Sequence, residues 1–287
     1  MSRQIFILHG SADNWDGARQ AMRHYVPEQS LRRYLAERPE PFVDSDERDY
    51  GDILTVDDST RGGARTCLIA RELGHAVTLF LNPFQIISGR DYWFSRFDAL
   101  IDARQATTAR FDGVTYNLQS RQELRDFRLA ARKYLVVSTE DAAHRLLDDI
   151  QVLLKAEGAQ VSGHARSIGP NDVAELQKAG VRLSSHGWDH QCLSGLSPDQ
   201  QLTQLLDRAD WLRAATGHEP RDYAVPFGQQ RLDPRARAAV PGMVYLVDPT
   251  LPPEVAGEGY LYRRNLTPTL QGMLASSPHI GSVDVVA

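Results

Sequence analysis

Short runs of apolar residues alternate along this chain with longer stretches whose apolar positions recur every three or four residues. The run Ile53–Val56 reads I-L-T-V and never alternates with a polar face, which is typical of a strand covered on both sides, as in parallel sheets. We predict further strands at Ile5–Leu8, His75–Leu81 and Met243–Val247, at a run that ends with Leu183, and, on a weaker pattern, at Gln160–His164.

The stretches between these runs predict helices. Asn171 and Ser197 are suited to cap two of them, which end near Gly180 and Thr216. The other helical patterns lie around Leu31–Leu35 and at Arg61–Leu73, Tyr92–Ile101, Arg121–Tyr134, Thr139–Ala156 and Pro234–Ala239. Strands that alternate with helices predict an α/β fold with a mostly parallel sheet, either open or closed into a barrel.

Three of the helical patterns begin within Asn82–Ile150, a segment rich in arginine. No linker rich in proline, glycine or serine marks a boundary beside it, so we predict one domain over residues 1–287 with a helical insertion at about residues 82–150. Phe111–Leu118 within this insertion is compatible with a loop or with a short hairpin.

Composition and charge restrict the cellular compartment and the classes of partner, but they do not identify the function. A hydrophobic share of 42% allows a sizeable core, and a net charge of −5 without a long basic run argues against nucleic acids and anionic membranes as partners. Cys67 and Cys192 are too few for a disulfide framework and favour a reducing compartment. The start M-S-R-Q-I-F-I-L-H-G does not resemble a signal peptide, and no run reaches the ~20 apolar residues that span a bilayer. We expect a cytoplasmic protein.

Two imidazoles are the first candidates for chemistry. Val181–Gln191 reads V-R-L-S-S-H-G-W-D-H-Q, a strand-like run followed by His186 and His190. If the backbone between them is helical, the two rings lie on one face and both can bind one ion. The alternative is a pair of surface or core-edge histidines without a ligand.

Two carboxylates end an earlier strand. Asp57 and Asp58 follow Val56 directly, and adjacent buried carboxylates repel unless a cation or a donor compensates them. One carboxylate with two imidazoles is a ligand set that leaves a position open for water on Zn²⁺ or a similar ion. The alternative for either aspartate is a helix cap or an Asx turn before Thr60.

Three motifs give the chain a family resemblance. T-V-D-D-S-T resembles the first motif of the polysaccharide deacetylases, which are carbohydrate esterases with the pattern T-F-D-D-G. H-G-W-D-H with the following L-S-G-L-S-P-D-Q resembles their second motif, and A-T-G-H-E-P-R-D-Y-A-V-P-F-G resembles their third. The motifs occur in the family's order over roughly residues 4–247. The resemblance implies a distorted (β/α)7-type barrel.

The resemblance also implies roles for single residues. Asp57 matches the family's general base, and Asp58, His186 and His190 match its metal ligands. The implied cofactor is a divalent metal ion, Zn²⁺ in the first place, with Co²⁺, Ni²⁺ or Mn²⁺ as alternatives. Such an ion lowers the pKa of water toward ~7 and polarises the acetyl carbonyl. The backbone N–H of Phe227 matches the donor that faces the developing oxyanion.

The chain departs from the family's pattern in three places. Ser59 stands where the first motif has glycine, and Ala224 stands where many members have an arginine that braces the base. Arg263 or Arg264 is a substitute for that arginine, or both are surface charges; we place Arg264 among the substrate-binding candidates. The family's last motif, L-x-H, supplies a general acid, but the only late histidine here is His279 in S-S-P-H-I-G, whose alternative is a solvated tail residue.

Three further residues are candidates for the substrate pocket. His9 ends the first predicted strand, Trp188 lies between the two candidate ligands, and Pro226 belongs to the third motif. Structural roles are the alternatives for all of them. The aromatic residues of the insertion, Tyr92, Trp93 and Phe94 among them, are expected in the core, with a substrate wall as the alternative.

The sequence therefore predicts a metal-dependent N-deacetylase that removes an N-acetyl or similar acyl group from an amino sugar or a small sugar-containing metabolite. The expected partner is a small-molecule or oligosaccharide substrate, and the oligomeric state is left open. One alternative is an amidohydrolase of the same fold that cleaves a non-sugar C–N bond. The other is a degenerate, non-catalytic binding protein.

Overall fold

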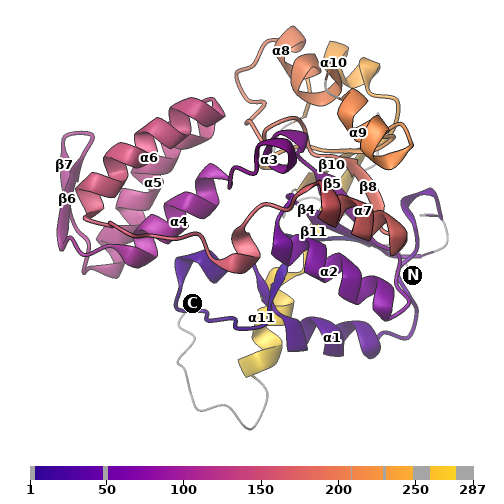
Figure 1. Ribbon diagram of the computed structural model, residues 1–287, viewed down its shortest axis with the longest axis horizontal. Coiled ribbons are helices and arrows are strands. Elements are labelled where there is room, and N and C mark those ends of the chain that lie inside the picture. The colour runs from indigo at the N-terminus through magenta and orange to yellow at the C-terminus, as the bar shows by residue number, and fades with distance from the viewer. Residues whose placement is uncertain (1–3, 48–50, 208, 229–230, 248–258, 276–287) are drawn as a thin grey trace.

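Seven parallel strands close into a barrel at the centre of the computed structural model, which describes residues 4–47, 51–207, 209–228, 231–247 and 259–275 (Figure 1). In hydrogen-bonded order they are β1 (Ile5–Leu8), β11 (Tyr260–Asn265), β10 (Val244–Val247), β9 (Tyr223–Ala224), β8 (Arg182–Ser185), β5 (Thr78–Leu81) and β4 (Ile53–Asp57). The (β/α)7-type barrel is confirmed. Because all seven strands run in the same direction, their carboxyl ends meet at one rim.

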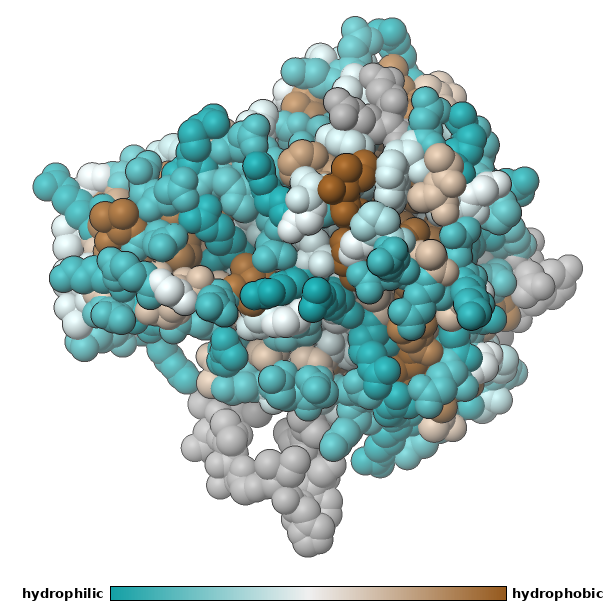
Figure 2. Space-filling view, in the orientation of Figure 1, coloured by the Kyte–Doolittle hydropathy of each residue, from teal (hydrophilic) through white to brown (hydrophobic). Residues whose placement is uncertain are grey.

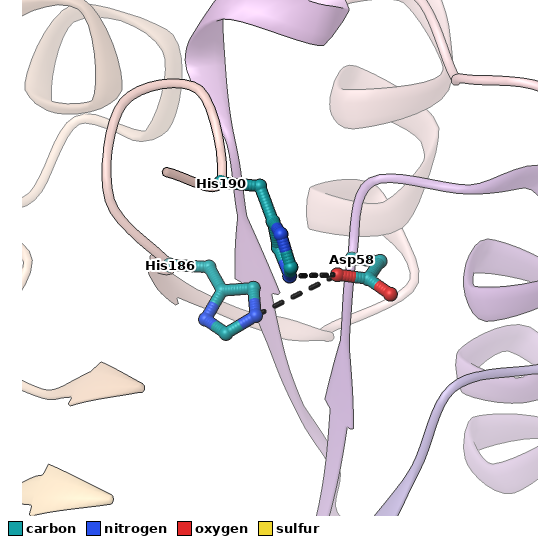
Figure 3. Close-up of side chains that lie close together, drawn as sticks. All are labelled: Asp58, His186 and His190. Carbon is teal, nitrogen blue, oxygen red and sulfur yellow. Dashed lines mark ion pairs between the residues drawn. The ribbon is translucent and has the colours of Figure 1, made fainter. Parts of the chain in front are cut away.

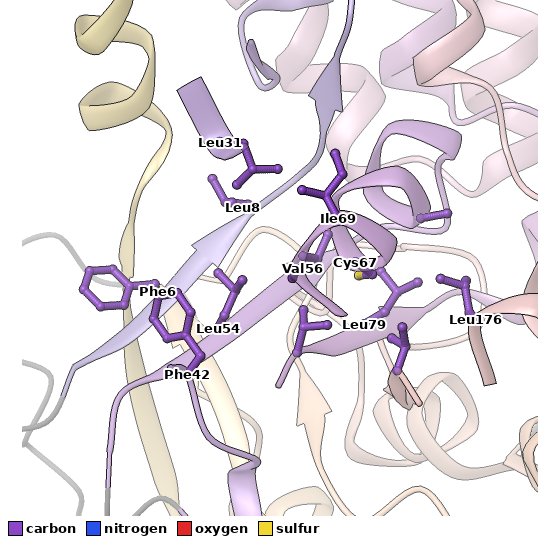
Figure 4. Close-up of a cluster of buried hydrophobic side chains, with 14 of the residues drawn as sticks. Phe6, Leu8, Leu31, Phe42, Leu54, Val56, Cys67, Ile69, Leu79 and Leu176 are labelled. Carbon is purple, nitrogen blue, oxygen red and sulfur yellow. The ribbon is translucent and has the colours of Figure 1, made fainter. Parts of the chain in front are cut away.

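Helices cover the outside of the barrel. They are α1 (Glu28–Ala36), α2 (Arg61–Glu72), α7 (Pro170–Lys178), α8 (Pro198–Leu202), α9 (Ala209–Thr216), α10 (Pro234–Ala239) and α11 (Thr267–Ala275). Figure 4 shows how the largest apolar cluster forms: Leu54, Val56 and Leu79 on the strands meet Leu31 of α1 and Ile69 of α2. Each fully buried side chain of this kind stabilises the fold by roughly 1.5–3 kcal/mol.

The other face of the same strands points into the barrel. Ile53 packs there with Phe80 and Tyr245. Thr55 and Asp57, two and four positions further along β4, share the inward face with Ile53 because side chains alternate along a strand. The barrel interior is therefore apolar near the amino ends of the strands and becomes polar toward the carboxyl rim.

The segment between β5 and α7 contains the predicted insertion. It holds α3 (Pro83–Ser88), α4 (Trp93–Ala103), the antiparallel hairpin of β6 (Thr108–Phe111) and β7 (Val114–Asn117), α5 (Arg121–Val137) and α6 (Glu140–Leu154). Helices α4, α5 and α6, with the hairpin at their far end, lie beside the barrel (Figure 1). They enclose an apolar cluster of their own, which includes Phe97, Phe127 and Leu147.

Most of the predicted elements are present, with three differences. Gln160–His164 was predicted as a strand, but a loop leads there into a 3₁₀ turn at Gly163–Ala165, because so few apolar residues offer no strand face to bury. The helix predicted up to Thr216 is two helices, α8 and α9, joined by a π-helical turn at Thr203–Asp207. The strand predicted at His75 begins at Thr78, since the His75 ring instead accepts a hydrogen bond from the N–H of Phe42.

Several short elements lie outside the barrel sheet. Strands β2 (Ser11–Ala12) and β3 (Val26–Pro27) form a separate two-stranded sheet, and 3₁₀ turns lie at Gln20–Met22 (η1) and Ser45–Glu47. None of the helices in the described ranges combines the length and the apolar character needed to cross a membrane. Teal, hydrophilic residues cover most of the face seen in Figure 2, with brown residues scattered among them.

Candidate metal centre and active site

The first two acidic side chains of the site lie where β4 ends. Asp57 is the last residue of the strand, and Asp58 has a left-handed backbone with φ of 72°, so the chain turns between them. Both side chains are buried. Thr60, not an aspartate, caps α2 by accepting a hydrogen bond from the N–H of Gly63 at 3.1 Å. The helix-cap alternative for Asp57 and Asp58 is therefore wrong, and both carboxylates are free for other partners.

The two histidines lie on the loop after β8. This loop is not helical, so the helical spacing considered from the sequence does not explain their approach. Instead, left-handed residues at Gly187 (φ of 79°) and His190 (φ of 62°) turn the chain back on itself. The two imidazole rings end with centroids 4.9 Å apart at an angle of 73°. The two imidazole rings are therefore brought together by the turns of the loop and not by a shared helix face.

Asp58, His186 and His190 converge on one point, as Figure 3 shows. Asp58 Oδ1 lies 3.2 Å from Nε2 of His190 and 3.6 Å from Nε2 of His186, and the three candidate ligand atoms all lie within 4.8 Å of one another. Among the described residues they form the only such group of three. All three side chains are buried.

This group fits a divalent metal ion. Asp58 Oδ1 is buried and accepts no well-aligned hydrogen bond, although two imidazole nitrogens are close to it. The other nitrogen of His186, Nδ1, lies 2.8 Å from the carbonyl oxygen of Ala224, which fixes the ring with Nε2 toward Asp58. Two imidazole nitrogens and one carboxylate oxygen are a donor set that suits Zn²⁺.

Burial and neighbouring charges set the protonation of these groups. Burial lowers the pKa of His186 to about 4, despite the opposing charge of Asp57, and so favours the neutral imidazole that a metal ligand must be. Burial alone would raise the pKa of Asp58, but the charge of His190 outweighs it and holds that pKa well below its ordinary value. The reciprocal charge of Asp58 raises the pKa of His190 against the effect of burial.

Arg263 braces the carboxylate of Asp57. Its Nη1 lies 2.5 Å from Asp57 Oδ1 and its Nη2 lies 2.7 Å from Oδ2, and Nη1 also lies 3.3 Å from the hydroxyl of Thr55. The guanidinium is fully buried. Burial would raise the pKa of Asp57, but Arg263, assisted by His186, keeps it below the ordinary value. Asp57 is thus held ionised, with Oδ2 3.7 Å from His186 Nε2.

Arg264 lies on the opposite side of β11. It is exposed, and its Nη1 lies 3.5 Å from the side-chain oxygen of Gln4. The prediction that Arg264 binds substrate is therefore wrong, because neighbouring residues on a strand point to opposite faces and only Arg263 points into the barrel. The strand that carries both was not recognised in the sequence; had it been, its alternation would have shown which arginine points inward.

Phe227 contributes a backbone group and a ring. Its φ is 62°, and its N–H donates to no acceptor within the described part of the chain. Its ring lies against His190, with centroids 4.8 Å apart. The next residue must be glycine, since Gly228 has φ of 65° and an added Cβ would lie 2.9 Å from the Cβ of Val247. A non-glycine residue with positive φ is strained, and Asp58, His190 and Phe227 all have this strain at one site.

A buried network connects the loop after β4 with the histidine loop. The backbone N–H of Ser59 donates to the Tyr92 hydroxyl at 2.6 Å, and that hydroxyl donates to Asn82 Oδ1 at 2.8 Å. Asn82 Nδ2 donates to the carbonyl oxygen of His186 at 2.7 Å. Ser59 has no positive φ, so the turn does not need the family's glycine. Asn82 was not predicted as a site residue, because its position in the chain carries no signal for this role.

A cavity of about 170 Å³ opens beside the three candidate ligands. His9 lines it, as do Trp93, Phe94 and Phe227, so the first two of these aromatics form a wall in addition to packing in the insertion. The imidazole of His9 has a buried Nδ1 that finds no hydrogen-bond partner in the described part of the chain. The cavity thus has a polar floor at the barrel rim and an aromatic side supplied by α4.

Two predicted pocket residues lie elsewhere. Trp188 is not among the described residues that line the cavity; its ring packs against Phe84 at a centroid distance of 5.9 Å. Pro226 is buried, and its ring packs against the backbone at Gly187. Both predictions are corrected: these residues shape the loops and do not face the cavity. His279, the candidate acid, lies outside the described residues.

Comparisons with known proteins agree with this architecture. The family model for polysaccharide deacetylase matches residues 135–246, which include His186, His190 and Phe227 but neither aspartate. This match confirms the resemblance to the family over the segment that holds the second and third motifs. No curated protein sequence matches the chain.

Solved structures share the fold at low sequence identity. The deacetylase PplD of Streptococcus pyogenes, in complex with acetate, is 13% identical, with 96% of this chain and 98% of that chain covered and a TM-score of 0.58. IcaB from Ammonifex degensii is 13% identical, with 96% and 97% covered and a TM-score of 0.54. The deacetylase domain of BpsB from Bordetella bronchiseptica is 13% identical, with 92% and 95% covered and a TM-score of 0.50.

Proposed function

We propose that this protein is a metal-dependent deacetylase that hydrolyses the N-acetyl, or a similar N-acyl, group of an amino sugar or a small sugar-containing metabolite. The observation that carries the proposal is the convergence of Asp58, His186 and His190 in a cavity that also receives the ionised carboxylate of Asp57. The fold shared with polysaccharide deacetylases supports the same reaction class.

In this proposal Asp58, His186 and His190 hold a divalent ion, Zn²⁺ before Co²⁺, Ni²⁺ or Mn²⁺. When bound, the ion supplies Lewis-acid polarisation of the acyl carbonyl and lowers the pKa of water. The carbonyl of Ala224 keeps Nε2 of His186 facing the ion through its bond to Nδ1.

Asp57 accepts the proton of the attacking water as the new C–O bond forms. Arg263 prepares it for this role, since the buried guanidinium keeps the carboxylate ionised and fixes its plane by two hydrogen bonds. The backbone N–H of Phe227, which has no other acceptor among the described residues, donates to the carbonyl oxygen as negative charge develops there.

The C–N bond then breaks, and the amine leaves with a proton. His279 remains our candidate donor of that proton. His9 lines the cavity and is proposed to contact substrate. We further propose that α4 to α6 belong to the single catalytic domain as an insertion that supplies one wall of the pocket, and that the protein acts on a soluble substrate in the cytoplasm.

The test is product analysis with zinc-loaded and cobalt-loaded protein. Acetate release is measured from N-acetylglucosamine, its short oligomers and N-acetylated non-sugar amines, and formate release is measured from the formylated counterparts. We expect acetate from the sugars, and release at least ~10²-fold slower from the zinc-loaded Asp57→Asn variant. Acyl release only from the non-sugar amines would favour the amidohydrolase alternative. Failure to retain any metal after zinc addition would favour the binding-protein alternative.

A further inference from the structure

The cavity extends beyond the candidate metal ligands to a second polar wall. This wall consists of His24, which follows the turn η1, Asp98 of α4 and Arg132 of α5, and all three line the cavity. The rings of His9 and His24 have centroids 5.7 Å apart, so the wall continues directly from the rim. None of the motifs read in the sequence includes His24, Asp98 or Arg132.

The acidic groups of this wall are already paired. Asp98 Oδ1 accepts a hydrogen bond from Arg128 Nη2 at 2.7 Å, and the two side chains are only 11% and 12% exposed. Asp102, one turn along α4 and not part of the wall, accepts hydrogen bonds from the backbone N–H groups of Gln20 and Ala21 at 2.8 and 3.1 Å. These contacts fix η1 and α5 to α4, and they leave no free carboxylate on the wall for another cation.

Arg132, unlike Asp98 and Arg128, is not paired within the described part of the chain. It lies one helical turn after Arg128, is half-buried, and makes no hydrogen bond or ion pair with any described residue. Burial lowers the pKa of Arg132; the charge of Asp98 opposes this effect, and the charge of Arg128 adds a smaller effect in the same direction as burial. An arginine nevertheless stays protonated in proteins. The wall therefore presents to the cavity a cation that has no direct hydrogen-bond or ion-pair partner among the described residues.

The two carboxylates at the barrel rim do not pair with Arg132. Asp57 is neutralised by Arg263, and Asp58 is the proposed ligand of a divalent cation. A guanidinium in a partly desolvated wall pairs best with a carboxylate or a phosphate, whose two oxygens match its two parallel N–H groups. A neutral acetylated sugar would leave this group without a counter-charge.

We propose that Arg132 binds an anionic group, a carboxylate or a phosphate, on the amino-sugar substrate. This inference rests on the proposed function for the position of the acetylated nitrogen, and it adds that the substrate is acidic. His24, beside Arg132 on the same wall, supplies a second donor for the same group. A carboxylate and a phosphate both pair with a guanidinium, and the binding experiment below uses one probe for each.

The test measures binding by calorimetry and does not require turnover. The probes are the deacetylated compounds glucosamine, muramic acid and glucosamine 6-phosphate, titrated into the zinc-loaded full chain. We expect at least one anionic probe to bind about tenfold or more tightly than glucosamine, as a charge-assisted guanidinium pair implies. A preference for muramic acid assigns a carboxylate, and a preference for glucosamine 6-phosphate assigns a phosphate.

Two variants separate specific binding from general attraction. Arg132→Gln should bring the affinity for the preferred anionic probe down to that for glucosamine, while Lys133→Gln, the same charge change at the exposed neighbour, should leave the preference intact. Equal affinities for all three probes, or equal losses in the two variants, would overturn the proposal. If Arg132-dependent binding appears but no acyl group is ever released from acidic or neutral sugars, the proposed reaction fails and the anion site stands.

Discussion

The carboxyl rim of the barrel forms one side of the cavity, and the helical insertion forms another through α4 and Arg132 of α5, but the two regions are built in different ways. The rim holds buried polar groups, and its Asp58, His190 and Phe227 have left-handed backbones. The helices hold a separate apolar cluster around Phe127 and meet the cavity mainly with aromatic rings and with Arg132, which has no ion-pair partner among the described residues.

This difference separates two tasks. The proposed metal binding and proton transfer need a few atoms at fixed positions, and strand ends and strained turns of the barrel provide such positions. Substrate contact needs a shaped and charged surface, which a helical segment with its own core can provide and change without disturbing the strands. Chemistry is therefore expected to depend on the rim, and selectivity on the helices.

The largest expected effect comes from removing one ligand on the rim. Asp58→Ala should lose the metal, because loss of even an outer contact to a ligand costs about 10–100-fold in affinity and loss of a ligand costs more. Metal content after gel filtration, measured by mass spectrometry, checks this, together with acetate release. Asp112→Ala is a matched control: Asp112 also has a left-handed backbone, with φ of 51°, but lies exposed in the hairpin of the helical region. Equal metal content in the two variants would remove the distinction between the regions.

The next effect separates catalysis from metal binding within the rim. Asp57→Asn should keep the metal and lose at least ~10²-fold in turnover, the usual size of a general-base contribution. The measurements are the steady-state rate and the metal content of the same sample. Since Arg263 loses a buried charge partner, thermal unfolding should be recorded to confirm that the variant is folded at the assay temperature. Wild-type turnover in folded, loaded Asp57→Asn would refute its role.

A core substitution in the helical region should affect stability and spare the metal. Phe127 is fully buried in the cluster of α4 to α6, and truncating such a residue to alanine costs about 3–5 kcal/mol. Phe127→Ala should therefore lower the free energy of unfolding in denaturant titrations while metal content stays at the wild-type level under native conditions. Loss of the metal from folded Phe127→Ala would show that the rim depends on the helical core.

The smallest effect is expected where the two regions join. Tyr92 stands just before α4, and its hydroxyl connects Ser59 with Asn82 on the rim. Tyr92→Phe should weaken zinc affinity by about tenfold, as expected when an outer contact to a ligand loop is lost. Competition with a chelator measures this affinity. Tyr116→Phe, whose ring packs on Phe127 in the helical region, serves as the control and should bind zinc like the wild type.

Features that depend on neighbouring residues in the chain could be predicted from the sequence. Ile53–Val56 shows a buried strand directly, and Asp57 and Asp58 follow it, so their place at the rim could be predicted. Parts that depend on distant contacts could not be. Asn82 reaches the histidine loop by a hydrogen bond between residues more than a hundred positions apart, and no motif surrounds it.

Strand register explains two further differences. The segment Tyr260–Asn265 has no strong period, so β11 was not predicted, and the choice between Arg263 and Arg264 could not be made without knowing which one faces inward. Trp188 illustrates the reverse case: its place between two candidate ligands suggested a pocket role, but the turn at Gly187 directs it toward Phe84. A residue next to a candidate ligand in the sequence can be placed in the site only when the local backbone conformation is known.

The central claim is that Asp58, His186 and His190 bind one divalent ion. Anomalous diffraction from a crystal of the wild-type protein grown with zinc tests it directly. The account predicts a single strong peak within ~2.0–2.2 Å of Asp58 Oδ1 and of Nε2 of both histidines. A zinc-saturated crystal with no peak between these three atoms would contradict it.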